Sequence, residues 1–307
     1  MLDLCAVVHP INKGWILDRM AKELCLTTPN SAVCYEPDSL PESSRYFITH
    51  YSMLPAILQQ VDPFKSAITC FFTHRKPGLE TFTDALNLCH SVIAESPEGV
   101  HILESIGVHP TLIHFVPEGG DSTAFQPHER TGQGSILICQ GYYPRKNVDL
   151  LLEVVSLLPD RKFLLLGKGW NLPILPNLTY LPDRPYSEYP SHYATCDVYF
   201  SPSKVEGGGP NSLIEAMHAN LFPVASDTGN ARQYITSGYN GLIFPVSAKA
   251  SEVSKLIEQA YLKRPKLLPP YSDVSETVAS FTWDNWAKQI TECLTGVYIH
   301  EDSDSIA

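Results

Sequence analysis

Residues 198–226, VYFSPSKVEGGGPNSLIEAMHANLFPVAS, decide the fold class of this 307-residue chain. The β-prone residues 198–201 run into a glycine-rich loop, a helical period covers residues 212–219, and an apolar strand pattern follows at 222–226. Two strands joined through a helix lie parallel in one sheet, because the crossover returns the chain to the same end. The segment therefore predicts an α/β protein.

The same alternation of strands and helices runs along most of the chain. Strands are expected at residues 4–8, 31–34, 46–49, 67–72, 91–94 and 112–116, and then at 136–139, 162–166, 198–201 and 222–226. Helices are expected at residues 15–26, 147–158, 212–219, 247–262 and 283–294. Each half is thus expected to form a doubly wound, Rossmann-like domain, in which ligands bind beyond the carboxyl ends of the strands.

The best candidate for an interdomain linker begins at Pro117, where glycine, proline and polar residues break the periodicity as far as Ser135. We expect a first domain at residues 1–127 and a second domain at residues 128–281. Residues 282–307 are expected to form a final helix, with the option of crossing back to the N-terminal domain, and an acidic tail.

The composition excludes several classes of function. With 44% hydrophobic and 18% charged residues, the chain has the makeup of a folded globular protein. Its formal net charge of −11 disfavours broad binding of nucleic acid or anionic lipid. Eight scattered cysteines contain no C-x-x-C pair, and no apolar run reaches the length of a membrane span. A cytoplasmic protein without stable membrane insertion is expected, and its oligomeric state is not indicated.

The loop at residues 206–212 has the features of an anion site. Its glycines allow the backbone to approach a ligand closely, and the helix that follows offers free N–H groups to phosphate oxygens. Ser212 and Glu215 also have the spacing of a capping box, in which the glutamate merely satisfies the start of the helix. The spacing leaves both roles open.

Two cations, Arg145 and Lys146, precede a second predicted helix start, with Asn147 as the expected N-cap. The helix dipole disfavours positive charge at this position, and an anion held between the two side chains would reverse that effect. A solvated basic turn is the alternative.

Six stretches in the second half resemble, in the same order, the retaining GT-B glycosyltransferases of family 4. They are Arg145-Lys-Asn-Val-Asp-Leu-Leu-Leu-Glu153, Leu166-Gly-Lys-Gly169, Ala194-Thr-Cys-Asp-Val-Tyr-Phe-Ser-Pro-Ser203, Glu206-Gly-Gly-Gly-Pro-Asn-Ser-Leu-Ile-Glu-Ala-Met217, Phe222-Pro-Val-Ala-Ser226 and Asn240-Gly-Leu242. The resemblance is specific from Ser135 to Phe244, weaker over residues 96–127, and a matter of pattern over the first ninety residues. It implies a GT-B fold, with two Rossmann-like domains facing a central cleft. Residues 1–127 would then be the acceptor-side domain, and residues 128–281 the nucleotide-sugar-binding domain.

The resemblance also implies roles for individual residues. Lys146 matches the lysine that binds the donor diphosphate, and Glu215 matches the second glutamate of the E-x7-E motif, which holds the donor ribose hydroxyls. Glu206 looks like the first glutamate, which sits beside the reacting carbon of the donor sugar. The loop and helix start would line the sugar and phosphates through Gly208, Gly209, Asn211 and Ser212.

The sequence departs from the family pattern at two positions. Eight residues separate Glu206 from Glu215 instead of seven, so Gly207 occupies the formal position of the first glutamate unless the loop bulges. The arginine usually found five residues before the lysine falls on Gly141, which leaves the neighbouring Arg145 to help neutralise the diphosphate.

Two loops that leave N-terminal strands are candidates for the acceptor side. Gly14, just before a predicted helix, offers backbone amides to the donor phosphates, and a plain tight turn is the alternative. His74, at a strand end and followed by two basic residues, is the histidine expected to hydrogen-bond the donor sugar or the acceptor. His9 and His50 are its rivals.

The resemblance implies transfer of a sugar from a nucleoside-diphosphate sugar to an acceptor hydroxyl with retention of configuration, and a saccharide is the expected acceptor. Glu206 and His74 are the expected catalytic residues. No metal or other cofactor is expected, because the only D-x-D, Asp302-Ser-Asp304, lies in the tail.

The alternatives are a nucleotide-sugar epimerase or hydrolase on the same fold, and a non-catalytic nucleotide-sugar-binding protein. A dinucleotide-dependent oxidoreductase is disfavoured because the first βα turns lack G-x-G-x-x-G.

Overall fold

The computed structural model describes residues 1–262 and 273–296, so Asp302 and Asp304 lie outside the described residues. Contacts within the chain divide it into two compact units. Unit 1 comprises residues 1–117 together with the segment that starts at Trp283, and unit 2 comprises Glu118–Thr282. The C-terminal helix therefore packs with the N-terminal part of the chain.

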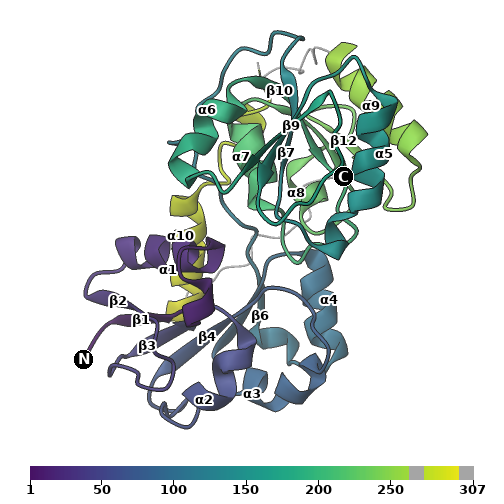
Figure 1. Cartoon of the computed structure of the whole chain (residues 1–307). Helices are drawn as coiled ribbons and strands as arrows, with labels where there is room; N and C mark the ends of the chain where they lie inside the picture. Colours follow the sequence, from purple (N-terminus) through teal and green to yellow (C-terminus); the bar gives the residue numbers. More distant parts are fainter. Residues whose placement is uncertain (263–272, 297–307) are drawn as a thin grey trace. The chain divides into compact units, whose positions relative to one another are not determined.

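Unit 1 is built on a six-stranded parallel sheet with the order β2-β1-β3-β4-β5-β6 (Figure 1). Its strands are β1 Leu4–Val7, β2 Ser31–Cys34, β3 Arg45–Ile48, β4 Ala67–Phe72, β5 Ser91–Ala94 and β6 Ile113–Phe115. Its helices are α1 Ile16–Thr27, α2 Leu54–Ile57, α3 Thr83–Asn87, α4 Pro97–Ser105 and α10 Trp283–Thr295.

Side chains of unit 1 alternate between the two faces of the sheet. Leu4, Ala6 and Val8 pack with residues of α1 and α10, which lie side by side in Figure 1. Cys5 and Val7 point the other way and pack with residues of α2, α3 and α4. Because successive side chains of a strand point to opposite faces, two apolar faces require helices on both sides.

Unit 2 contains a second six-stranded parallel sheet, with the order β12-β11-β10-β7-β8-β9. Its strands are β7 Ser135–Cys139, β8 Phe163–Gly167, β9 Leu178–Pro182, β10 Cys196–Ser201, β11 Phe222–Ser226 and β12 Leu242–Phe244. Its helices are α5 Val148–Leu157, α6 Tyr189–Tyr193, α7 Asn211–His218, α8 Ala231–Tyr234 and α9 Ala250–Leu262. One hydrophobic core joins this sheet to its helices.

Both sheets contain a point at which the strand order reverses. In unit 1 the reversal falls between β1 and β3, and in unit 2 it falls between β7 and β10. Helices that leave two such neighbouring strands go to opposite faces, so the loops at their carboxyl ends diverge and leave room for a ligand. The topology thus marks one candidate binding edge on each unit.

The prediction of an α/β protein with two Rossmann-like domains is confirmed. Strands β2, β4, β5 and β11 have the expected bounds, and most other expected elements are displaced by one or two residues at an end. The sequence analysis missed the strands β9 and β12 and the helices α2, α3, α4, α6 and α8. β9 is an edge strand without a fully buried residue, and β12 has only three residues, so neither carries a strong strand pattern.

The eight cysteines are all unpaired, and burial raises the pKa of several of them, including Cys139 and Cys196, each to about 12. Among residues 1–262 and 273–296, no helix is both long enough and apolar enough to cross a membrane.

Trp286→Ala is expected to lower the free energy of unfolding of unit 1 by about 3–5 kcal/mol, because it leaves a cavity where the buried ring contacts Phe47 and Phe71. Urea unfolding followed by far-UV circular dichroism measures the change. Phe64→Ala is the control, since its side chain is 91% exposed, and its expected change is below about 0.5 kcal/mol. Equal losses in the two variants would contradict this packing.

Candidate functional site

The expected donor residues of unit 2 lie on two loops that leave neighbouring strands at the reversal point. The loop after β7 carries Arg145 and Lys146 in a 3-10 turn, Pro144–Lys146, and the loop after β10 carries Glu206. Asn147 has left-handed backbone angles, with φ of 54°, and α5 begins at the next residue. Asn147 is therefore the N-cap residue of α5, as expected, but its side chain makes no capping hydrogen bond.

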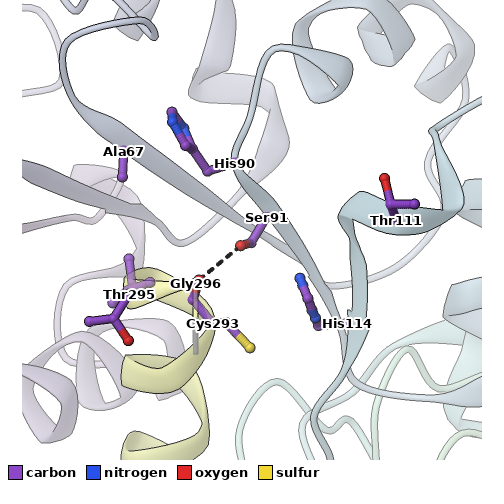
Figure 2. Close-up of a pocket in the computed structure, with 9 residues that line it drawn as sticks. Ala67, His90, Ser91, Thr111, His114, Cys293, Thr295 and Gly296 are labelled. Atoms are coloured by element: carbon purple, nitrogen blue, oxygen red, sulfur yellow. Dashed lines mark hydrogen bonds between the residues drawn. The ribbon is translucent and has the colours of Figure 1, made fainter. Parts of the chain in front are cut away.

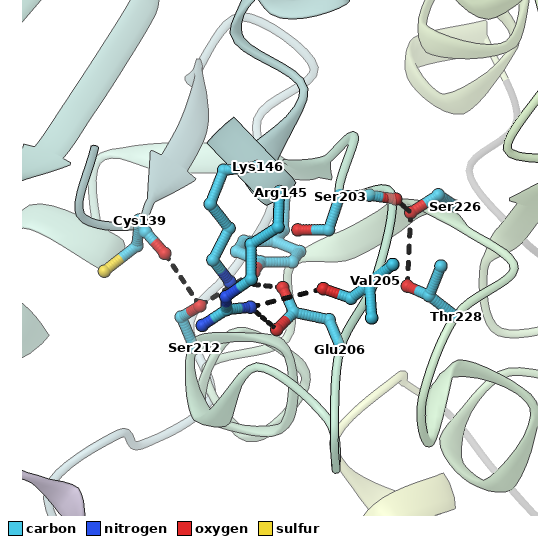
Figure 3. Close-up of polar contacts among 10 residues, drawn as sticks. Cys139, Arg145, Lys146, Ser203, Val205, Glu206, Ser212, Ser226 and Thr228 are labelled. Atoms are coloured by element: carbon cyan, nitrogen blue, oxygen red, sulfur yellow. Dashed lines mark hydrogen bonds and ion pairs between the residues drawn. The ribbon is translucent and has the colours of Figure 1, made fainter. Parts of the chain in front are cut away.

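The Glu206 carboxylate joins the two loops. One of its oxygens is ion-paired with the Lys146 ammonium and the other with the Arg145 guanidinium (Figure 3). Arg145 also donates to the carbonyl of Val205 at 3.2 Å, and its own carbonyl accepts from the backbone N–H of Lys204 at 2.7 Å. Although the glycine-rich loop is one residue longer than in the family pattern, Glu206 contacts Lys146, and Gly207 does not take its place.

This cluster of three charges is largely removed from solvent. The side chains of Lys146 and Glu206 are 8% and 6% exposed, whereas that of Arg145 is 42% exposed. Burial lowers the pKa of Lys146, and the positive charge of Arg145 adds to this effect, while Glu206 opposes it. Burial by itself would raise the pKa of Glu206, but the charges of Lys146 and Arg145 hold that pKa below its ordinary value. The cluster carries two positive charges and one negative charge, so it has a net attraction for an anion.

Ser212 lies inside α7 and not at its N-cap, which is Pro210. Its hydroxyl donates to the carbonyl of Cys139 at 2.9 Å and lies 2.8 Å from the hydroxyl of Tyr199. The capping-box alternative for Ser212 and Glu215 is therefore wrong. The serine instead fastens the first turn of α7 to the end of β7, so the helix start is fixed at the reversal point of the sheet.

Glu215 is buried within α7 and faces a group of tyrosines. One carboxylate oxygen accepts a hydrogen bond from the hydroxyl of Tyr186, and the other lies 3.4 Å from the hydroxyl of Tyr193. Phe125 packs against both tyrosine rings. The sequence analysis missed Tyr186, which lies between two of the quoted stretches and belongs to neither.

The glycines of the loop lie against the chain that follows β11. Gly229 has φ of +54°, and a Cβ atom built there would stand 1.7 Å from the carbonyl oxygen of Gly208. A Cβ at Gly209 would stand 3.0 Å from the ring of Tyr234. Side chains at these positions would push the loop out of place, which explains why glycine is required.

Three amide side chains at this edge each have one buried polar atom without a hydrogen-bond partner among the described residues. These atoms are Gln140 Nε2 after β7, Asn211 Nδ2 at the start of α7, and Asn230 Oδ1 after β11. An unsatisfied buried polar atom is costly, and a polar ligand at the edge would satisfy it. Gln140 and Asn230 were not expected from the sequence.

The two remaining expected residues, Gly14 and His74, lie in unit 1. Gly14 has φ of +80° and follows β1, but its N–H donates to the carboxylate of Asp18 at 2.7 Å. His74 follows β4, and its carbonyl oxygen lies 3.4 Å from the hydroxyl of Tyr51. The structure thus groups Arg145, Lys146, Glu206, Gly208, Gly209, Asn211, Ser212 and Glu215 in unit 2.

A pocket of about 430 Å³ lies at the opposite, amino-terminal edge of the unit 1 sheet (Figure 2). Its lining includes His90, Ser91 and His114, and the Ser91 hydroxyl donates to the carbonyl of Cys293 at 3.1 Å. None of the residues expected from the sequence lines it. In the part of the chain that the structure describes, no group of three or more His, Cys, Asp or Glu residues is placed to hold a metal ion.

A family model matches the part of the chain that contains this site. Residues 121–270, which are 150 of the 307 residues, match the family model described as "Glycosyl transferases group 1". The matched segment contains every expected donor residue of unit 2. No curated protein sequence matches the chain.

Solved structures resemble the chain over almost its whole length. Anabaena Alr3699/HepE in complex with UDP and glucose aligns with a TM-score of 0.77 and 14% identity, covering 96% of this chain and 100% of the other. Sucrose-phosphate synthase from Thermosynechococcus elongatus aligns with a TM-score of 0.79 and 13% identity, covering 97% and 99%. The lipopolysaccharide outer core galactosyltransferase WaaB in its apo form aligns with a TM-score of 0.73 and 13% identity, covering 96% and 99%. The chain has the GT-B fold.

Glu206→Gln is expected to lower stability near neutral pH, because it removes the charge that neutralises the buried Lys146. The folded-state pKa of Glu206 lies below its ordinary value, so the stabilisation is present above the unfolded-state value of about 4.3 and is lost as the pH falls through the folded-state value. The difference in unfolding free energy between wild type and variant should therefore shrink as the pH is lowered from neutral. Urea unfolding at a series of pH values measures it, with the exposed Glu153→Gln as control. A difference that does not vary with pH would contradict the ion-paired state of Glu206.

Proposed function

We propose that this protein is a glycosyltransferase that moves a sugar from a nucleoside-diphosphate sugar to an acceptor hydroxyl, with retention of configuration and without a metal ion. The observation that carries the proposal is the Arg145–Lys146–Glu206 charge cluster, with Lys146 and Glu206 buried, at the strand-order reversal of unit 2, most of which matches the group 1 family model. Two of the similar solved structures are described as complexes with UDP, which supports a nucleoside diphosphate as the leaving group.

The donor is held by residues of unit 2 in this proposal. Lys146 and Arg145 neutralise the diphosphate, and the backbone at Gly208 and Gly209 allows the sugar and phosphates to approach closely. Asn211 and Ser212 place the start of α7 beside the phosphates, where the helix dipole favours negative charge. Glu215 accepts hydrogen bonds from the ribose hydroxyls.

Transfer breaks the bond between the anomeric carbon and the diphosphate oxygen, which leaves with the electron pair. The cations and the helix start stabilise the charge that develops on the leaving group. The acceptor oxygen forms the new bond to the anomeric carbon, and its proton passes to a departing phosphate oxygen or to a protein base. Glu206 lies beside the cations and is the group assigned to the oxocarbenium-like centre. His74 and Gly14 of unit 1 remain predicted contacts of the sugar or acceptor and of the donor phosphates.

The proposal includes two conditions for activity: independence of metal ions and a reducing compartment. Because the protein's own cations neutralise the diphosphate, transfer should proceed in the presence of a metal chelator. The unpaired state of all eight cysteines fits work in the reducing cytoplasm, which remains the predicted compartment.

Lys146→Ala and Glu215→Ala are each expected to weaken nucleoside diphosphate binding by about 10- to 150-fold, the effect of losing a charged hydrogen-bonding partner of about 1.5–3 kcal/mol. A thermal-shift screen against UDP, GDP, ADP, CMP and dTDP identifies the base, because a ligand that binds only the folded state raises the unfolding midpoint. Lys255→Ala and Glu153→Ala remove exposed charges elsewhere in unit 2 and serve as controls. Unchanged diphosphate affinity in both site variants would refute the assignment of the donor site.

Glu206→Ala is expected to depress turnover more than donor binding, because its carboxylate acts as charge develops on the sugar. Steady-state kinetics with the donor identified by the screen separate kcat from KM. Products analysed with and without acceptor distinguish transfer from epimerisation or hydrolysis. Donor binding without turnover of any kind would identify a nucleotide-sugar-binding protein and overturn the enzyme assignment.

A further inference from the structure

The segment that follows the edge strand β9 reaches the buried Glu215 of α7. It carries a 3-10 turn, Tyr186–Glu188, and then α6. The Tyr186 hydroxyl donates a hydrogen bond to one oxygen of the Glu215 carboxylate, and the Tyr193 hydroxyl lies 3.4 Å from the other. The proposed donor site uses Glu215 but gives no role to either tyrosine.

Both contacts have a defined donor. An ionised carboxylate only accepts hydrogen bonds, and a phenol has one hydrogen to donate. Burial raises the pKa of Tyr193 well above its ordinary value, and the charges of Cys139 and Glu215 raise it further, so this hydroxyl keeps its proton. The two tyrosines thus occupy acceptor sites on different oxygens of the same carboxylate.

A cluster of aromatic rings fixes the direction of the two hydroxyls. The centroid of the buried Phe125 ring lies 5.8 Å from that of Tyr186 and 4.7 Å from that of Tyr193. The ring of Tyr189 lies against Tyr186 from another side, with 5.6 Å between the centroids. Tyr193 is fully buried, whereas Tyr186 is 40% exposed. Of the two tyrosines that contact Glu215, Tyr186 is therefore the one that solvent reaches.

These two contacts restrict a rotation of Glu215 that is otherwise soft. The terminal torsion of a glutamate side chain is broad, so a carboxylate without such contacts samples many orientations of its plane. Donors on both oxygens select one orientation before any ligand binds. Ribose hydroxyls that bind this carboxylate then lose less free energy to the ordering of the side chain.

We infer that Tyr186 is a positioning residue, which orients Glu215 for the ribose hydroxyls of the donor nucleotide. The inference rests on the proposed function, because it needs Glu215 to contact the ribose. Tyr186 acts through Glu215 and takes no part in bond making. This role differs from that of a tyrosine that only stabilises the fold, and from that of a tyrosine that competes with the ribose for the carboxylate.

Tyr186→Phe tests these three roles, because it removes the hydroxyl and keeps the ring that packs against Phe125. Isothermal titration with UDP and with 2′,3′-dideoxyuridine diphosphate measures how much the ribose hydroxyls strengthen binding. GDP or ADP and its dideoxy form replace this pair if the thermal-shift screen selects that base. The variant is expected to weaken binding of the ribose form by about 3- to 10-fold, the cost of ordering one more side chain. Binding of the dideoxy form should stay unchanged.

Tyr189→Phe is the matched control, since it removes a hydroxyl from the same cluster of rings and keeps the contact of Tyr186 with Glu215. Both affinities should stay at the wild-type level in this control. Equal weakening of the ribose and dideoxy forms in Tyr186→Phe, together with a lower unfolding midpoint of the ligand-free protein, would mean a role in fold stability alone. Tighter binding of the ribose form would mean competition. Either result would overturn the inference.

Failure of the proposed function gives a different result. A wild-type protein that binds none of these diphosphates, or that binds the ribose and dideoxy forms equally, would refute the assignment of Glu215 and the inference with it. Glu215-dependent binding of the ribose form that is unaffected by Tyr186→Phe would overturn the inference alone.

Discussion

The buried carboxylate of Glu206 is the constraint on which the candidate site depends. A charge removed from water must be paired, and here its partners come from the loop of the neighbouring strand. Because β7 and β10 are adjacent in the sheet, the residues that follow them meet without any long excursion of the chain. The Lys204 N–H to Arg145 carbonyl bond adds a backbone link between the same two loops. Sheet order therefore determines which charges meet.

Close backbone approaches hold these loops from the other side. A Cβ atom at Gly229 would overlap the carbonyl oxygen of Gly208. A Cβ atom at Gly167, at the end of β8, would likewise overlap the carbonyl oxygen of Gln140. Both glycines have positive φ, at 54° and 140°, which other residues rarely adopt. Each loop of the charged cluster is thus packed against a neighbouring glycine, and the charges are fixed by the backbone as well as by each other.

The sequence predicted both sheets and the loops of the candidate site, because strand and helix patterns are local and the loops follow strand ends. It could not decide the role of Ser212, since the deciding partner is the carbonyl of Cys139, 73 residues away. Tyr186 and Gln140 were missed for the same reason: a hydroxyl reaching Glu215 and an unsatisfied amide are consequences of packing, not of spacing. The edge strand β9 was missed because its half-buried residues lack alternation.

The ring of Tyr143 lies close to position 141, where the family pattern has an arginine. A Cβ at Gly141 would stand 3.1 Å from the ring of Tyr143, so any larger residue would require that ring to shift. The ring of Tyr143 also lies 5.6 Å from the guanidinium of Arg145, a distance suited to a cation–π contact. Glycine at 141, tyrosine at 143 and arginine at 145 are therefore coupled. The ring of Tyr143 lies beside position 141 and also contacts the guanidinium of Arg145. Arg145, at the far end of the loop after β7, forms the ion pair with Glu206.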